Sequence, residues 1–238
     1  MEITLHDEPE RAQGDERFTV ELPDGRREQL RVHDYDKVYA IPGLYEAVVQ
    51  ERLECASPQV LADALSAAVA DAGEDVAALR VLDMGAGNGV VAESLRGRGV
   101  RAPFVGLDPE PAAAPAAARD RPGLYRHYFT ATLEEISVAG AVAEYDLTCL
   151  AGAGALGLGH VSRHQIETAW SAFGVGSWLA VTFSEAVLGP EGGELGAFVT
   201  ALQEGDDTDV VRLERFRHRL TMSGEELFYY VLVARRAA

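Results

Sequence analysis

The sequence predicts an α/β fold: a doubly wound, mostly parallel seven-stranded sheet that ends in an antiparallel hairpin and follows a small N-terminal hairpin and helices. Two observations carry this prediction. Between residues 80 and 203, short apolar runs typical of strands alternate with segments typical of helices, which favours a parallel sheet covered on both faces. After residue 203, two strand patterns follow each other with only a short connection, which requires an antiparallel pair.

Residues 1–33 are predicted to form an N-terminal arm with a β-hairpin, and residues 34–238 the main domain with helices at its start. Strand patterns between Phe18 and Val32 are interrupted by Pro23-Asp24-Gly25, which is typical of a turn. The arm is rich in acidic residues, so we interpret it as a solvated flap, with a cover over a binding site as the alternative.

Two helices are predicted before the first core strand. Pro42 opens an apolar-periodic segment, and we interpret Ser57 as the N-cap of a second helix, with Pro58 at its first position and Gly73 at its end. Core strands are expected at residues 80–84, 103–108, 125–130, 145–150 and 178–183, and helices at 89–98, from 110, at 162–173 and at 191–203. Pro115 is expected to bend or interrupt the helix that starts at residue 110.

Two further strands, at residues 210–220 and 227–236, are expected to close the domain. The last strand is apolar on both faces, whereas its partner carries several arginines, among them Arg215 and Arg219. A strand that is apolar on both faces belongs inside a sheet, so we place the arginine-rich strand at the edge. Trp170 and Trp178 lie in helix and strand patterns and are assigned to the core.

The composition is that of a folded protein, with 47% hydrophobic and 25% charged residues. Lysine and arginine total 21 against 38 acidic residues, which gives a net charge of -17. This charge repels phosphate backbones, so we expect no nucleic-acid partner. The chain has no run of about 18 apolar residues and no leader pattern, so we expect a cytoplasmic protein with no membrane partner.

A glycine-rich segment, Asp83-Met84-Gly85-Ala86-Gly87-Asn88-Gly89, connects the first core strand to a helix. Glycine has no Cβ, so the backbone can turn tightly and a ligand can contact it directly. The second core strand ends in Asp108, where a carboxylate can accept hydrogen bonds from both hydroxyls of an adenosine ribose. The turn and the acid together predict a site for a nucleoside-containing ligand.

The glycine spacing distinguishes two kinds of nucleotide ligand. A dinucleotide site requires Gly-x-Gly-x-x-Gly or Ala, but counting from Gly85 the sixth position is Val90. Asp83 also precedes the glycines, where an acid would attract an ammonium group and repel a pyrophosphate. A nicotinamide-dependent oxidoreductase is therefore the weakest hypothesis.

These residues resemble the class I S-adenosylmethionine-dependent methyltransferases, whose first motif, acid-x-Gly-x-Gly-x-Gly, matches Asp83 to Gly89 at every fixed position. That family's Rossmann-like, seven-stranded sheet also ends in an antiparallel hairpin. Residues 155–160 and 218–225 further resemble small bacterial and Williams–Beuren-type methyltransferases. The resemblance extends roughly from Asp34 to the C-terminus and implies that S-adenosylmethionine is bound and S-adenosylhomocysteine released.

The resemblance also implies which residues contact this cofactor. Asp83 would hold the methionine ammonium group and Asp108 the ribose. Tyr35 and Tyr39 lie in a segment that would fold over the cofactor as a lid, although packing of the arm explains them almost as well. The other implied contacts are Gly85, Ala86, Gly87, Gly89, Pro109, Thr132, Leu133 and Leu150. Family members commonly place an acid near the adenine amine where this chain has Thr132, so backbone groups or the Thr132 hydroxyl would serve instead.

Methyl transfer from a sulfonium is a direct displacement, so alignment of the reacting atoms can supply about 7 to 11 kcal/mol of the barrier and a base is optional. Residues 151–155, all small, are expected to form the loop after the fourth strand, which would either leave room for the acceptor or be a flexible connection. His160 and His164 are candidate bases, with a structural role as the alternative. Their spacing mimics a metal site, but no third ligand follows, so no metal is expected. Glu185 is a candidate base or substrate anchor, or simply an exposed carboxylate.

Three hypotheses share this cofactor site. We favour transfer of a methyl group to an oxygen, nitrogen or carbon nucleophile of a small organic molecule. A protein methyltransferase that attracts basic partners through its acidic surface is the second. A non-catalytic module that binds S-adenosylmethionine is the third.

Overall fold

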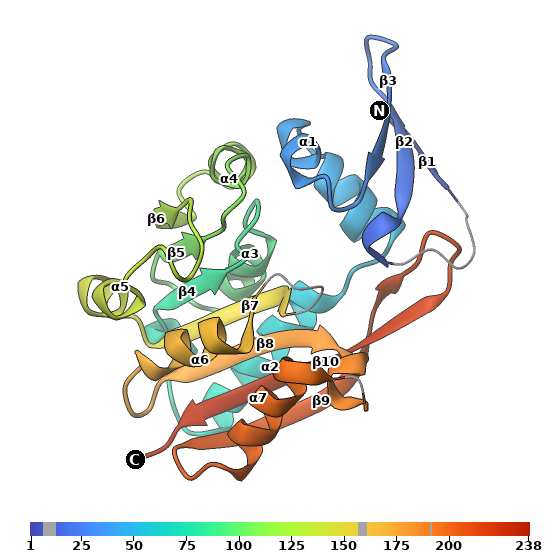
Figure 1. Cartoon of the computed structure of the whole chain (residues 1–238). Helices are drawn as coiled ribbons and strands as arrows, with labels where there is room; N and C mark the ends of the chain where they lie inside the picture. The colour runs from blue at the N-terminus through green and yellow to red at the C-terminus, as the bar shows by residue number, and fades with distance from the viewer. Residues whose placement is uncertain (7–12, 157–160, 191) are drawn as a thin grey trace.

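The computed structural model describes residues 1–6, 13–156, 161–190 and 192–238 (Figure 1). Its main sheet has seven strands in the order β6-β5-β4-β7-β8-β10-β9, and a separate three-stranded sheet, β1-β2-β3, lies near the N-terminus. Strands β10 and β9 are antiparallel to their neighbours, whereas the other strands of the main sheet are parallel. The predicted fold class is therefore confirmed.

The N-terminal sheet consists of β1 (Glu2–Leu5), β2 (Arg17–Glu21) and β3 (Arg27–Arg31), with the 3₁₀ helix η1 (Gln13–Asp15) before β2. The hairpin predicted between Phe18 and Val32 is confirmed, and Gly25 takes the positive φ of 83° at its turn. Strand β1 was not predicted, because a four-residue strand carries too short an alternation to be recognised alone.

The arm is not a solvated flap. Its inner-face residues, such as the fully buried Phe18 and Val20, belong to one hydrophobic cluster with Leu44 and Leu53 of the following helical segment. Met222, at the tip of the C-terminal hairpin, completes this cluster. The many acidic residues of the arm suggested exposure to solvent. They did not indicate that its apolar residues are buried in this cluster.

Three helical segments follow the arm: α1 (Tyr35–Ala40), the π-helix η2 (Glu46–Arg52) and α2 (Ser57–Asp71). The apolar-periodic segment after Pro42 thus contains a π-helix, and Gly73 follows α2 with a φ of 72°. Ser57 is the first residue of α2 and makes no side-chain cap, so the predicted N-cap is wrong. Its hydroxyl is instead hydrogen-bonded to Nδ1 of His218, 2.6 Å away.

The remaining elements alternate between strands and helices as predicted. They are η3 (Val76–Ala78), β4 (Val81–Met84), α3 (Val90–Gly97), β5 (Phe104–Leu107), α4 (Ala113–Asp120), β6 (Tyr125–Phe129), α5 (Val138–Tyr145), β7 (Cys149–Leu156), α6 (Arg163–Ser171), β8 (Trp178–Ser184), η4 (Glu185–Leu188), α7 (Gly193–Glu204), β9 (Thr208–Leu220) and β10 (Glu226–Arg236). Of these elements, η3, α5 and η4 were not predicted. Pro115 does not interrupt α4, because it lies in the first turn, where no hydrogen bond of the helix needs its nitrogen.

Two expectations for the fourth core strand are wrong. Residues 138–145 form helix α5, so the strand begins only at Cys149. It then continues through residues 151–155, which were expected to form a loop, because Gly152 pairs with Val181 and Leu156 with Phe183 of β8. Pairing with a neighbouring strand decides the conformation of these small residues, and their own preferences do not indicate it.

Helices cover both faces of the main sheet (Figure 1). Helices α5, α6 and α7 pack on one face, in a cluster with Trp170, and α2 and α3 pack on the other, in a cluster with Trp178. Both tryptophans are buried, as predicted, and β10 lies inside the sheet with β9 at its edge. In the described part of the chain, no helix is long and apolar enough to span a membrane.

Candidate functional site

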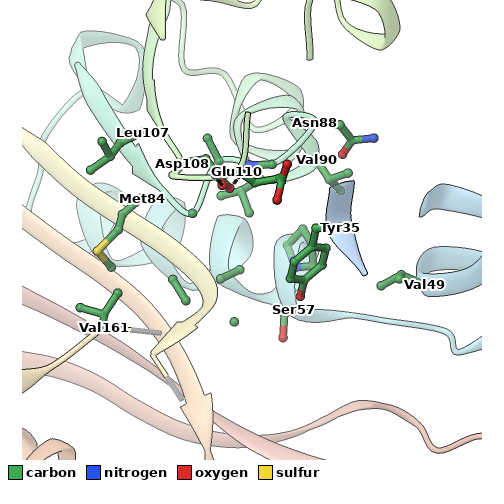
Figure 2. Close-up of a pocket in the computed structure, with 18 of the residues that line it drawn as sticks. Tyr35, Val49, Ser57, Met84, Asn88, Val90, Leu107, Asp108, Glu110 and Val161 are labelled. Atoms are coloured by element: carbon green, nitrogen blue, oxygen red, sulfur yellow. Dashed lines mark hydrogen bonds between the residues drawn. The ribbon is translucent and has the colours of Figure 1, made fainter. Parts of the chain in front are cut away.

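A cavity of about 430 Å³ lies where the carboxyl ends of β4, β5 and β7 meet the N-terminal helical segments (Figure 2). Pockets for small ligands typically measure about 300 to 1,000 Å³. The cavity lies at the edge of the sheet where open α/β folds bind their ligands. Its wall includes the glycine turn, residues 107–110, residues 131–133, residues 153–155 and residues from both ends of the chain.

The glycine turn brings bare backbone to the cavity wall. Gly85 and Gly87 have φ values of 67° and 51°, and the N–H groups of Gly85 and Ala86 donate to the Leu107 carbonyl at 2.8 and 3.1 Å. A Cβ on Gly87 would overlap the hydroxyl of Tyr39, and one on Gly85 would lie 3.0 Å from Cβ of Ala155. Glycine at these two positions is therefore needed both for the turn and for close packing above it.

Gly89, in contrast, lies outside the cavity lining, so a direct ligand contact there is not supported. A Cβ on Gly89 would meet Arg121 and Leu124 at 3.0 Å and Tyr125 at 3.2 Å, and its φ is 98°. This glycine is required for packing of the turn against β6 and the connection that precedes it. The third glycine of the motif thus packs against residues on the side of the turn that faces away from the cavity.

Asp83 also lies outside the cavity lining, which corrects the expectation that it holds an ammonium group. Side chains alternate along β4, so Met84 faces the cavity and Asp83 faces the opposite side. There the fully buried Asp83 carboxylate accepts a hydrogen bond from Tyr125 Oη at 2.7 Å. Burial raises the pKa of Asp83 to about 7, against the opposing effect of the Tyr125 hydrogen bond.

Asp108 links the second core strand to the glycine turn. Its Oδ2 accepts a hydrogen bond from the Gly87 N–H and its Oδ1 one from the Glu110 N–H, both at 2.9 Å. Its own N–H donates to the carbonyl of Phe129 at 3.0 Å. Asp108, Pro109 and Glu110 line the cavity, so a fixed carboxylate lies beside the backbone of the turn.

Thr132 and Leu133 line the cavity beyond Asp108. The N–H and hydroxyl of Thr132 donate to Oε2 of Glu135, at 2.8 and 3.1 Å, which fixes this segment. Leu150 does not line the cavity. It is fully buried in the sheet, where it pairs with Leu82, so the predicted cofactor contact at Leu150 is wrong.

Three tyrosines form the wall opposite the turn. Tyr35, Tyr39 and Tyr45 all line the cavity, and ring centroids are 5.6 Å apart for Tyr35 and Tyr39 and 5.3 Å for Tyr39 and Tyr45. Burial and the nearby Asp108 raise the pKa of Tyr35 to about 12, so its hydroxyl stays protonated at neutral pH. The predicted lid segment therefore does contact the cavity.

Polar contacts hold this lid on the sheet. Nδ2 of Asn88, in the glycine turn, donates to Oε1 of Glu46 at 2.6 Å, and Arg121 donates to the same oxygen at 2.8 Å. Arg119 donates to the backbone carbonyl of Tyr39 at 3.0 Å. The turn, helix α4 and the lid therefore form one connected network.

The predicted bases do not lie in the cavity. His164 is exposed on α6, whose residue in the lining is Gln165. Glu185 is half-exposed and forms an ion pair with Arg215 at 2.8 Å. His160 lies outside the described residues. Within the described ranges, no group of three or more His, Cys, Asp or Glu side chains is arranged to hold a metal ion.

The sequence reasoning missed a polar group at the cavity wall. Cys55, Ser57, His218 and Tyr229 all line it, and His218 Nδ1 lies 2.6 Å from Ser57 Oγ and 3.9 Å from Cys55 Sγ. The His218 ring also stacks on Tyr229, with centroids 3.8 Å apart. The sequence marks residues 218–225 only by a family resemblance and Ser57 only as a helix start. No local pattern indicates that they share a site, because only the pairing of β9 with β10 and the entry of α2 bring them together.

Comparisons with known proteins identify the fold. No protein-family model matches the sequence, and no curated protein matches it either. Among solved structures, the plantazolicin methyltransferase BpumL in complex with S-adenosylhomocysteine matches with a TM-score of 0.54 and 10% identity, over 86% of this chain and 95% of that one. Magnesium protoporphyrin IX methyltransferase from Synechocystis PCC 6803, with S-adenosylhomocysteine bound, matches with a TM-score of 0.52 and 17% identity, over 75% and 83%.

A Pyrococcus horikoshii protein whose suggested activity is RNA methylation matches with a TM-score of 0.54 and 14% identity, over 74% of this chain and 84% of that one. The names of these three proteins point to unlike acceptors, so the shared architecture does not identify an acceptor here. The narrower likeness to Williams–Beuren-type methyltransferases stays a prediction. The chain has the fold of class I S-adenosylmethionine-dependent methyltransferases.

Proposed function

We propose that this protein is an S-adenosylmethionine-dependent methyltransferase that methylates an oxygen, nitrogen or carbon nucleophile of a small organic molecule. One observation carries the proposal: the glycine turn and Asp108 line the same cavity and are joined by the hydrogen bond from Gly87 N–H to Asp108 Oδ2. A nucleoside with an amino-acid tail needs both parts, a carboxylate for the ribose and an open backbone for the tail.

The residues present fit this cofactor. Asp108 would accept hydrogen bonds from the ribose hydroxyls, and the segment with Thr132 and Leu133 would contact the adenine. The backbone of the turn around Gly85 and Ala86 would contact the methionine part, beside Tyr39, whose hydroxyl lies against Gly87. The bound cofactor supplies an electrophilic methyl carbon on a sulfonium, and S-adenosylhomocysteine is the product.

The chain contributes positioning and the exclusion of water. The tyrosine wall, Met84 and Val90 give the cavity an apolar lining around its few polar groups. A displacement at a methyl carbon gains most from alignment of nucleophile and leaving group. No side chain is therefore required to act as a base in this proposal.

Two observations favour a small acceptor over a macromolecule. The cavity lies beneath the N-terminal helical segments, which are fixed to the glycine turn through Glu46 and Asn88. The net charge of -17 opposes binding of nucleic acid. A protein acceptor, or binding without transfer, remains an outcome of the tests. A cytoplasmic location without a membrane partner also belongs to the proposal.

Calorimetric titration with S-adenosylhomocysteine tests the cofactor site. Hydrogen bonds to a charged group contribute about 1.5 to 3 kcal/mol, so Asp108→Ala should weaken binding about 10- to 100-fold. Glu185→Ala is the matched control, because this carboxylate lies outside the cavity lining, and it should change the affinity less than about twofold. Reduced nicotinamide dinucleotide should not bind.

Equal affinities of wild type and Asp108→Ala would contradict the placement of the ribose. Transfer of a labelled methyl group to compounds in a metabolite extract then distinguishes the acceptors. Label in protein alone would favour a protein methyltransferase. Binding of S-adenosylmethionine without any transfer would favour a non-catalytic module.

A further inference from the structure

The cavity has two polar ends. One is formed by Asp108 and Glu110, which follow β5, and the other lies on the far side of Tyr35. In Figure 2, Tyr35 lies between Glu110 and Ser57, and its hydroxyl points toward Ser57. Cys55, His218 and Tyr229 line the cavity together with Ser57. The proposed cofactor contacts, at the glycine turn and Asp108, do not include any of these four residues.

His218 is held rigidly at this end. It is only 7% exposed, its Nδ1 shares a 2.6 Å hydrogen bond with Ser57, and its ring stacks on Tyr229 at an interplanar angle of 21°. Burial and the neighbouring Arg219 lower the pKa of His218 to about 3, so the ring is neutral near pH 7. A neutral imidazole has one nitrogen that accepts a hydrogen bond and one that donates.

The charges around His218 favour an uncharged ligand group. Among the described residues that line the cavity, the carboxylates are Asp108 and Glu110, both beyond Tyr35. The guanidinium of Arg219 is paired with the buried Glu16. A cationic amine placed beside His218 would find no carboxylate partner there, and burial of an unpaired charge is costly.

The walls near this end are aromatic and aliphatic. Tyr35, Tyr45 and Val49 line the cavity together with Cys55. The Cys55 thiol lies 3.9 Å from Nδ1 of His218. Flat aromatic walls suit a planar ring, because aromatic pairs gain from stacked or edge-to-face contact.

We propose that this end of the cavity binds the hydroxyl group of a phenolic methyl acceptor, with its ring against Tyr35 and Tyr45 and its hydroxyl donating to Nε2 of His218. Ser57 is then a positioning residue, which accepts from Nδ1–H and so selects the tautomer whose Nε2 is free to accept. This inference rests on the proposed function and names the acceptor class for the same site.

The test uses the full chain saturated with S-adenosylhomocysteine and small probes of graded chemistry. Phenol and catechol carry the ring and the hydroxyl, cyclohexanol lacks the aromatic ring, toluene lacks the hydroxyl, and benzylamine carries a cation. Binding is followed by the ¹H–¹³C signals of the His218 imidazole. We expect phenol and catechol to shift these signals at millimolar concentrations, and the three other probes to leave them in place.

Two variants sharpen the test. His218→Phe keeps an aromatic ring stacked on Tyr229 but removes the nitrogen, and phenol affinity should fall about tenfold, the size of one lost hydrogen bond. Ser57→Ala should change the imidazole signals of free His218 and weaken phenol binding to a similar degree. His164→Phe, on the exposed face of α6, is the matched control and should leave phenol binding unchanged.

The outcomes separate the two proposals. Absence of S-adenosylhomocysteine binding to wild type would overturn the proposed function itself. Tight binding of S-adenosylhomocysteine with no shift of His218 by phenol, or equal affinities of phenol and benzylamine, would overturn only the acceptor class. If His218→Phe fails to fold, as judged by its binding of S-adenosylhomocysteine, the wild-type shifts and Ser57→Ala decide the question.

Discussion

Asp83 and Asp108 are acids at the ends of neighbouring parallel strands, yet their environments differ. Asp108 lines the cavity and accepts hydrogen bonds from two backbone N–H groups. Asp83 is fully buried on the other side of its strand, against Tyr125. The same residue type thus lines the cavity at one position and is buried in the fold at the other, because Asp108 lies just past the end of β5, whereas Asp83 lies inside β4.

The buried position of Asp83 makes stability depend on pH. In the folded state its pKa is raised to about 7, against 3.8 for a free aspartate. Between these values the folded state binds more protons, so the free energy of unfolding falls as pH rises, by at most about 1.4 kcal/mol per pH unit. Asp83→Asn should abolish this fall and be more stable than wild type at pH 8.

Urea unfolding at several pH values between 4 and 8 measures this effect. The stability difference between Asp83→Asn and wild type should grow in favour of the variant as the pH rises. Tyr125→Phe removes the hydrogen bond that favours the charged carboxylate, so it should shift the transition to higher pH. Parallel stability curves for wild type and Asp83→Asn would refute this assignment.

At the scale of elements, the glycine turn and helix α1 are fitted to each other. Gly87 lies directly beneath the Tyr39 hydroxyl, and Arg119 of α4 holds the backbone carbonyl of Tyr39. The hydroxyl of Tyr128 donates to the Gly87 carbonyl at 2.7 Å. The turn is therefore packed from both sides, and its shape depends on elements that are distant in sequence.

Gly87→Ala tests this fit. For an alanine at a φ of 51°, the left-handed conformation costs about 1 to 2 kcal/mol, and its Cβ overlaps the Tyr39 hydroxyl. We expect Gly87→Ala to be less stable than wild type and to bind S-adenosylhomocysteine more weakly. In the double variant Gly87→Ala/Tyr39→Phe, which lacks the hydroxyl, the loss of binding should be smaller than in Gly87→Ala. Thermal unfolding and calorimetry measure the two effects.

Gly99→Ala is the matched control for this experiment. Gly99 has a φ of 106°, a Cβ added to it would meet no atom within 4 Å, and it lies outside the cavity lining. The variant should lose stability through its backbone conformation and keep the affinity of wild type. Equal loss of binding for both glycine variants would show that overlap with Tyr39 does not matter.

The sequence predicts elements well where the pattern is local. The alternation of strands and helices and the antiparallel ending follow from residue spacing, and the structure confirms the seven-stranded sheet that they predict. Residues 151–155 fail this rule, because pairing with β8 extends strand β7 through small residues that carry no strand pattern. Helix α5 was missed for a similar reason, since Val138 and Ala141 become a buried face only after packing on the sheet.

The candidate site divides in the same way. Asp108 and the first two motif glycines could be predicted because they follow strands whose carboxyl ends share one edge. The prediction that His164 and Glu185 lie in the cavity was wrong. Both residues follow core strands in the sequence, but this does not fix the direction of a side chain, and neither lines the cavity. His218 was missed because it comes from strand β9, at the sheet edge, and meets Ser57 only through the tertiary fold.

At the scale of the whole molecule, the N-terminal arm packs against the tip of the C-terminal hairpin. The N-terminal sheet, the lid and Met222 share one hydrophobic cluster. The buried Glu16 forms an ion pair with Arg219, and its Oε1 accepts from the Met222 N–H at 3.1 Å. Arg219 also donates to the Leu220 carbonyl at 2.7 Å and lines the cavity. The N-terminal sheet and the tip of the C-terminal hairpin therefore contact each other although they are distant in sequence (Figure 1).

This connection predicts a strong coupling between Glu16 and Arg219, whose side chains are only 6% and 4% exposed. Loss of one partner leaves a buried charge without compensation, so Glu16→Gln or Arg219→Met should each lower the free energy of unfolding by about 3 to 5 kcal/mol. The double variant should lose much less than the sum, because no unpaired charge remains. Asp71→Asn, which breaks the surface pair with Arg212, is the control and should lose about 1 kcal/mol or less. Urea unfolding of the four variants measures this coupling: additive losses for Glu16→Gln and Arg219→Met would mean that the two side chains contribute to stability independently.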